Sequence, residues 1–186
     1  VLLHWSDFSG NILKIFPLWI APGRWFYSGL VGMIVASLLL SKQLKIRFSY
    51  IVDAFAASVA VSGIIASLGT LLEGSEVGRV TSWPLRVLFV GHPGLRHPYG
   101  LYEALLFFLL SIFLIVLQQI ASKRHAPYGI IGIVFFLLLS IGLFSLEFFK
   151  DSPVYLRGLT INQWVLIGFF AQSFGALLVR VRFWSM

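Results

Sequence analysis

Residues Gly91 to Leu110, "GHPGLRHPYGLYEALLFFLL", join a polar segment to the start of a long apolar run. The polar half contains two His-Pro pairs, an arginine, a tyrosine and a glutamate. The apolar half continues to Ile120, which gives about the 20 residues that a helix needs to cross a bilayer. The stretch therefore predicts a membrane-spanning helix whose first turns carry polar side chains at the membrane surface.

The composition of the whole chain agrees with a membrane protein. Of its 186 residues, 59% are hydrophobic and 11% are charged, whereas soluble domains carry about 25% charged residues. We therefore expect an all-α integral membrane protein that forms a single transmembrane domain over residues 1–186. The absence of cysteine excludes disulfides, thiolate metal sites and a cysteine nucleophile within these residues.

Hydropathy divides the chain into five predicted transmembrane helices. They cover residues 24–41, 51–72, 100–120, 128–149 and 161–181. The second contains "AFAASVAVSGIIASLG", whose small residues allow close helix packing, so we expect this helix to be central. Residues 1–23 read as an interfacial segment, and residues 73–99 as a polar loop.

The net charge of +7 raises the question of what the basic residues contact. No basic run exceeds two residues, so we expect contacts with anionic lipid and no nucleic acid. The 14 Lys and Arg residues divide equally between the two sides of the membrane. One set lies in short loops, where the positive-inside bias acts, which predicts a cytoplasmic C-terminus and an extracytoplasmic polar loop.

Glu103 and Glu147 each have two interpretations. Glu103 in a first helical turn would gain about 0.3–1 kcal/mol from the helix dipole, or it could belong to a polar site. Glu147 stands near a helix C-terminus, where a carboxylate needs a partner. Lys150 could pair with it at the surface, or Arg79 or Arg96 could reach it across the bundle and join three segments into one site.

Three weaker features remain. "EGSEVGRVTSWP", residues 73–84, suits either an interfacial loop that approaches a phosphate or an ordinary solvated loop. His92 and His97 make a weak metal signal, and we expect no metal site. Asp53 reads as a helix cap or a snorkelling residue on the cytoplasmic side.

Residues Arg96 to Glu103, "RHPYGLYE", resemble a signature of the prolipoprotein diacylglyceryl transferases. That family shows Arg-His-Pro, then Ser or Thr, Gln, and Leu-Tyr-Glu at the head of a transmembrane helix. "RWFYSGLVG" (Arg24–Gly32) and "SLEFFKDSP" (Ser145–Pro153) are similar to two further family segments in the same order. The resemblance thus covers nearly the whole chain.

The resemblance implies a multi-pass protein of the bacterial inner (plasma) membrane that binds phosphatidylglycerol. The family transfers a diacylglyceryl group from that lipid to the cysteine thiol of a lipoprotein precursor and releases glycerol phosphate, without a cofactor. The implied catalytic residues are His97, Tyr102, Glu103 and Glu147. The implied lipid phosphate-binding residues are Arg79 and Arg96.

Several family positions are substituted. Tyr27 stands for a histidine, Ser67 and Thr70 for an arginine and an asparagine, Ser75 for a glutamate, and Leu143 for a second arginine. Losing one electrostatic donor to a leaving group costs about 2.7–4 kcal/mol of barrier.

Whether the chain is an enzyme therefore stays open at the level of sequence. We favour a diverged, non-catalytic relative that acts as a lipid-binding or structural subunit of a membrane complex with other membrane proteins. An active transferase is the alternative. A transporter or channel is disfavoured because the spans carry few internal charges and show no inverted repeat.

Overall fold

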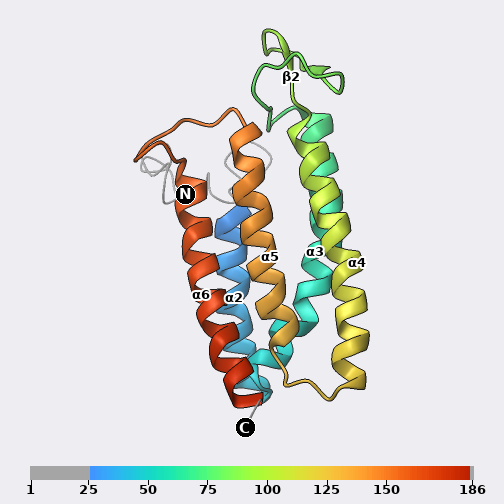
Figure 1. Ribbon diagram of the computed structural model, residues 1–186, viewed down its shortest axis with the longest axis vertical. Coiled ribbons are helices and arrows are strands. Elements are labelled where there is room, and N and C mark those ends of the chain that lie inside the picture. Colours follow the sequence, from blue (N-terminus) through green and yellow to red (C-terminus); the bar gives the residue numbers. More distant parts are fainter. Residues whose placement is uncertain (1–25, 185–186) are drawn as a thin grey trace. The chain divides into compact units, whose positions relative to one another are not determined.

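The computed structural model describes residues 26–184 and is mostly helical (Figure 1). Its long helices are α2 (Phe26–Leu44), α3 (Phe48–Glu73), α4 (Tyr99–Lys123), α5 (Ile130–Leu146) and α6 (Ile161–Trp184). Within these residues, four segments are long and apolar enough to cross a membrane, and Gly29–Leu44 forms a shorter apolar helix. The expected fold class, an all-α integral membrane protein, is confirmed. The interfacial segment predicted for residues 1–23 lies outside the described residues.

The chain separates into two compact units, Val1–Ala36 and Ser37–Met186. The single transmembrane domain therefore stays a prediction. In the second unit, α3 packs along α4 and α5 packs along α6, while α5 also contacts α3 and α4.

Glycines allow these helices to approach closely. A Cβ added at Gly63 of α3 would lie 2.5–2.7 Å from ring atoms of Phe107 on α4, and one at Gly100 would lie 2.7 Å from the Ser67 carbonyl oxygen. Phe107 is buried in this contact. The small residues of the second predicted span thus serve the packing role that the sequence indicated.

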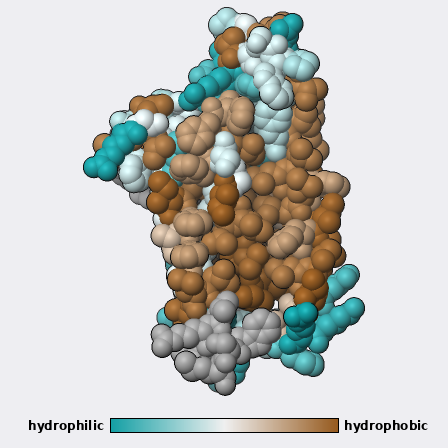
Figure 2. Space-filling model, viewed as in Figure 1, coloured by the Kyte–Doolittle hydropathy of each residue, from teal (hydrophilic) through white to brown (hydrophobic). Residues whose placement is uncertain are grey.

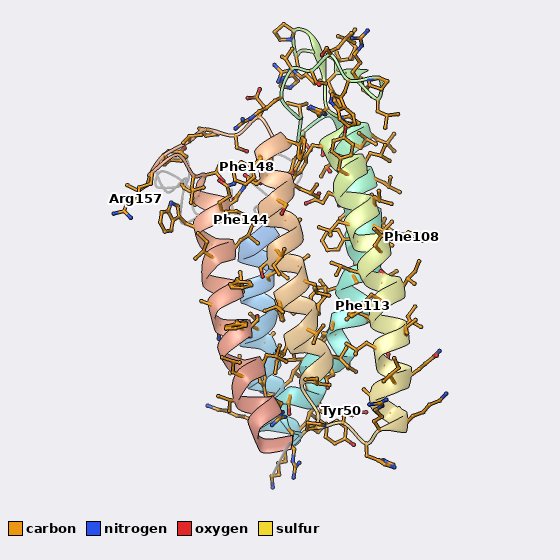
Figure 3. The ribbon with its side chains drawn as sticks, in the orientation of Figure 1. Tyr50, Phe108, Phe113, Phe144, Phe148 and Arg157 are labelled. Carbon is orange, nitrogen blue, oxygen red and sulfur yellow. The ribbon has the colours of Figure 1, made fainter. Side chains whose placement is uncertain are left out.

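The outer faces of the helices are apolar. Phe108 and Phe113 of α4 are about half exposed (Figure 3). Figure 2 shows hydrophobic side chains along the helices and hydrophilic ones toward both of their ends, including the loop that precedes α4. Since exposed apolar side chains on a spanning helix meet lipid tails, this distribution suits a bilayer.

The predicted polar loop contains a short antiparallel pair, β1 (Val87–Leu88) and β2 (Leu95–Arg96). The loop ends at Pro98, and α4 begins at Tyr99. Glu103 is consequently in the second turn of α4, not in the first turn as one interpretation required. At the far end of α5, the short 3-10 helix η3 (Glu147–Phe149) continues the chain.

Candidate functional site

Three backbone segments meet at the end of the second unit that carries β1 and β2 (Figure 1). We call residues 77–81, 95–97 and 149–151 the loop platform. The Arg79 amide donates to the Phe149 carbonyl oxygen (2.8 Å), the His97 amide to the Arg79 carbonyl oxygen (3.0 Å) and the Asp151 amide to the Val77 carbonyl oxygen (3.1 Å). These bonds join the segments that follow α3, precede α4 and follow α5.

Gly78 makes this close arrangement possible. Its amide donates to the His97 carbonyl oxygen at 3.2 Å, and a Cβ at this position would collide with the same carbonyl oxygen and with the His97 Cβ. A side chain at residue 78 would therefore separate two of the three segments.

Arg96 is the buried cation of the loop platform. Its Nη1 donates to Asp151 Oδ2 (2.5 Å) and to the Gly78 carbonyl oxygen (3.1 Å), and its Nε donates to the Pro93 carbonyl oxygen (3.3 Å). The Arg96 side chain is 9% exposed and that of Asp151 is 53% exposed. Arg96 thus ties the platform together, and a carboxylate from the same fold neutralises its charge.

The other two platform cations differ in their partners. Lys150 Nζ pairs with Glu76 Oε2 at 2.9 Å and lies 5.0 Å from the centre of the Tyr99 ring. Arg79 Nε donates to the Lys150 carbonyl oxygen at 3.2 Å, and its Nη1 and Nη2 have no hydrogen-bond partner among residues 26–184. The exposed Arg79 is therefore the platform cation whose guanidinium remains open to an anion.

His97 and Tyr102 form a pair beside these cations. His97 Nδ1 lies 3.1 Å from Tyr102 Oη, at hydrogen-bond distance. The Phe149 ring centre lies 5.4 Å from that of His97 and 6.1 Å from that of Tyr102. The aromatic contacts hold the imidazole in place at the edge of the loop platform.

Glu103 connects α4 to α3. Its Oε2 accepts a hydrogen bond from Ser67 Oγ at 2.9 Å. Ser67 is buried, and its own carbonyl oxygen accepts from Thr70 Oγ1 at 2.9 Å. Of the two substituted family positions, Ser67 thus bonds directly to the retained glutamate, while the Thr70 hydroxyl bonds only to the backbone of α3.

Glu147 has none of the partners that the sequence suggested. It is buried, and its Oε1 accepts hydrogen bonds from Thr160 Oγ1 (3.1 Å) and Asn162 Nδ2 (2.9 Å). The interpretation that Lys150, Arg79 or Arg96 pairs with it is wrong. The loop that precedes α6 folds back and brings neutral donors from the start of that helix to Glu147.

Thr160 also starts α6. Its Oγ1 accepts from the Gln163 amide (3.2 Å), and Gln163 Oε1 accepts from the Thr160 amide (3.0 Å). This reciprocal pair is a capping box, and "TINQ" ahead of an apolar run is its sequence signal. Our sequence reasoning missed Thr160, Asn162 and Gln163, as well as Asp151.

The structure therefore brings Arg79, Arg96, His97 and Tyr102 together on or beside the loop platform. Glu103 and Glu147 are each held by a residue of a neighbouring helix, and Glu103 lies close enough to Lys150 and Glu147 for their charges to act on it. At the opposite end of the unit, Asp53 accepts hydrogen bonds from the amides of Gly129 (2.5 Å) and Gly132 (2.8 Å). The helix-cap interpretation of Asp53 is confirmed, although the helix it caps is α5.

The second unit combines apolar spanning helices with a polar platform of cations, a histidine and carboxylates. Together with the following comparisons, this arrangement indicates a transferase-like membrane protein. The family model for prolipoprotein diacylglyceryl transferase matches residues 1–179. The chain belongs to the prolipoprotein diacylglyceryl transferase family, and the resemblance noted from its motifs is confirmed.

Named relatives agree with this assignment. The phosphatidylglycerol–prolipoprotein diacylglyceryl transferase of Geobacter sulfurreducens is 34% identical over 152 residues, which cover 81% of this chain and 57% of the relative. The protein of the same name from Mesorhizobium japonicum is 31% identical over 176 residues, or 94% of this chain and 60% of the relative. The chain thus spans less than two thirds of the length of these relatives.

Proposed function

We propose that this chain binds the headgroup of an anionic phospholipid at the loop platform and does not transfer the diacylglyceryl group. One observation carries the proposal: Arg96, a phosphate-binding residue by family resemblance, is buried and already donates to Asp151, Gly78 and Pro93. A guanidinium whose charge is already paired with a carboxylate attracts a second anion less strongly.

The transfer reaction requires positive charge near the leaving group. The cysteine sulfur, once its proton is removed, attacks a glyceryl carbon, and a C–S bond forms as the C–O bond to the phosphate breaks. Negative charge then builds on the leaving glycerol phosphate, and nearby cations must stabilise it. The cations on the platform are Arg79, Arg96 and Lys150, and two of them are in ion pairs.

The substituted positions lower the available charge further. Ser67 and Leu143 stand where the resemblance places arginines, and both are buried. At about 2.7–4 kcal/mol of barrier for each lost donor, the remaining groups support binding better than catalysis. Arg79, with its open guanidinium, suits one phosphate contact of the bidentate kind.

A lipid-binding pseudoenzyme of this kind fits a role as a subunit of a membrane complex. In the proposed orientation, the loop platform faces the extracytoplasmic side of a bacterial plasma membrane and the C-terminus is cytoplasmic. The apolar outer faces of the helices, such as the one that carries Phe108 and Phe113, would meet lipid or partner helices. Such a subunit should co-purify with other membrane proteins in mild detergent.

An active transferase is the second candidate, and the pair of His97 and Tyr102 favours it. A base, a phenol and the open Arg79 lie on one platform. Such a set could deprotonate a thiol and contact a phosphate. Glu103 and Glu147 would then complete the set of implied catalytic residues.

A transfer assay separates the two candidates. The protein is placed in nanodiscs with phosphatidylglycerol and a cysteine-bearing lipoprotein-precursor peptide, and mass spectrometry looks for the diacylglyceryl mass on the peptide. An active relative runs in parallel. If the parent transfers the diacylglyceryl group above the no-enzyme blank, and Arg96→Ala abolishes this transfer, the chain is an active enzyme and our proposal is contradicted.

Binding is measured separately by native mass spectrometry of retained phosphatidylglycerol. We expect Arg79→Gln to reduce retention about tenfold, which corresponds to losing roughly 1.4 kcal/mol of a charged contact. Arg86→Gln is the matched control, because Arg86 is an exposed cation of the same loop that donates to the Ser82 carbonyl oxygen. Equal retention by both variants would contradict a headgroup site at Arg79.

A further inference from the structure

A basic cavity lies at the end of the second unit opposite the loop platform. Its volume is about 560 Å³, and it is lined by Arg47, Phe48, Ser49, Pro127, Tyr128 and Arg180. These residues come from the start of α3, the loop before α5 and the last part of α6. Among the described residues, its charged lining consists of two arginines.

The Arg180 guanidinium is only partly satisfied. One of its Nη atoms donates to the Tyr128 carbonyl oxygen. Its Nε is buried and has no hydrogen-bond partner among the described residues. An unsatisfied buried donor costs about 1–3 kcal/mol, so the fold leaves the Arg180 guanidinium short of acceptors.

One described acid, Asp53, lies near enough to Arg180 for their charges to attract, but it forms no ion pair with either arginine. Asp53 lines a neighbouring cavity with Tyr50, which lies at this end of the unit (Figure 3). Both Asp53 oxygens accept backbone amides of α5, and Asp53 forms no ion pair with an arginine among residues 26–184. Further cations at this end, Lys45, Lys123 and Arg124, make the local potential more positive.

We propose that this cavity binds a phosphate group between Arg47 and Arg180. Guanidinium groups bind phosphate oxygens with paired, charge-assisted hydrogen bonds, and the Ser49 hydroxyl adds a neutral donor. The cavity is larger than a phosphate, and Phe48 and Tyr128 provide a wall for attached apolar atoms. Since three spanning helices end here, the phosphate of a membrane phospholipid is one source, and free phosphate from solution is the other.

The first arm of the test uses lipid. The full-length protein carries Arg79→Gln, which weakens the loop platform equally in every variant, and native mass spectrometry measures retained phosphatidylglycerol against diacylglycerol, which lacks the phosphate. We expect phosphatidylglycerol to be retained and diacylglycerol to be lost. Adding Arg47→Gln should reduce retention about tenfold, as should Arg180→Gln.

Arg124→Gln is the matched control, because Arg124 is an exposed cation of the same end that does not line the cavity. Arg47 is exposed and its side chain has no partner in the described part of the chain, so its loss leaves the fold intact. Equal losses for Arg47→Gln and Arg124→Gln would show that diffuse positive charge, and not the cavity, holds the lipid.

The second arm uses inorganic phosphate on delipidated protein. If phosphate raises the melting temperature of the Arg79→Gln protein but not of the same protein with Arg47→Gln added, while phosphatidylglycerol is not retained, the phosphate group comes from solution. If neither phosphatidylglycerol nor inorganic phosphate distinguishes Arg47→Gln from Arg124→Gln, the proposal is overturned. Because every variant is compared in the Arg79→Gln background, this result is independent of the proposed function.

Discussion

Arg96 Nη1 and Asp151 Oδ2 lie 2.5 Å apart, although the two residues are 55 positions apart in the chain. Their ion pair holds the segment before α4 against the segment after η3. It also neutralises a cation that family resemblance assigns to the lipid phosphate. The availability of Arg96 to a ligand therefore depends on one half-exposed carboxylate.

Replacing that carboxylate should strengthen headgroup binding. In Asp151→Asn, Arg96 keeps its bonds to two carbonyl oxygens but loses its counter-charge, so an incoming phosphate no longer competes with a carboxylate. A pair of this exposure contributes about 1 kcal/mol, and we expect phosphatidylglycerol affinity to rise about fivefold. Native mass spectrometry in a lipid titration measures the change. Asp151→Glu keeps the charge and is the control; an unchanged affinity in folded Asp151→Asn would disprove the competition.

Glu147 should be required for stability through its role as an acceptor. Glu147→Gln retains an oxygen for Thr160 Oγ1 and Asn162 Nδ2, and we expect a loss of about 1 kcal/mol in the free energy of unfolding. Glu147→Leu removes the acceptor of both donors and should cost about 2–4 kcal/mol. Denaturant titration in detergent micelles measures both values.

The same two variants separate structure from catalysis at this position. If the chain is an active transferase with Glu147 as a catalytic group, Glu147→Gln should abolish transfer while the protein remains folded. If Glu147 only anchors the start of α6, transfer by an active protein would survive this substitution. A Glu147→Leu variant as stable as the parent would contradict the anchoring role.

The close contact of α3 with α4 should tolerate no added methyl group at Gly63. The Cβ of an alanine at residue 63 would lie 2.5 Å from the Phe107 ring, whereas a Cβ added at Gly69 of the same helix would have no described atom within 4 Å. We expect Gly63→Ala to lower the free energy of unfolding by about 1–3 kcal/mol. Gly69→Ala should be neutral or raise it by up to about 1 kcal/mol, because alanine favours helix. Thermal unfolding in detergent compares them, and equal melting temperatures would show that the interface relaxes freely.

The sequence predicted the helices well because a bilayer imposes a length on apolar runs. The predicted span at 51–72 corresponds to α3 at Phe48–Glu73, and the one at 161–181 corresponds to α6 at Ile161–Trp184. The resemblance of "RHPYGLYE" also identified the family. Each of these inferences depends on contiguous residues and on no long-range geometry.

The partners of the candidate site residues were not predictable in the same way. The sequence offered Glu147 three candidate cations, one of them close in the chain and two across the bundle, yet its acceptor oxygen is filled by Thr160 and Asn162. That choice depends on how residues 150–160 fold back onto the end of α5. Asp151 likewise reaches Arg96 because the backbone of 149–151 pairs with that of 77–79, which no local pattern indicates.

Asp53 should hold the start of α5 against α3 by capping a helix other than its own. Its two oxygens accept the amides of Gly129 and Gly132, which are among the amides that a helix N-terminus leaves without intrahelical partners. Asparagine offers one carbonyl oxygen, so Asp53→Asn leaves one amide facing a donor. We expect the free energy of unfolding to fall by about 1–2 kcal/mol and hydrogen exchange to accelerate at residues 129–133. Ser58→Ala, an exposed change on the same helix, is the control. If exchange at these amides matches the parent in Asp53→Asn, the cap contributes nothing, and helix packing, such as that of Gly132 against Val52, would position α5.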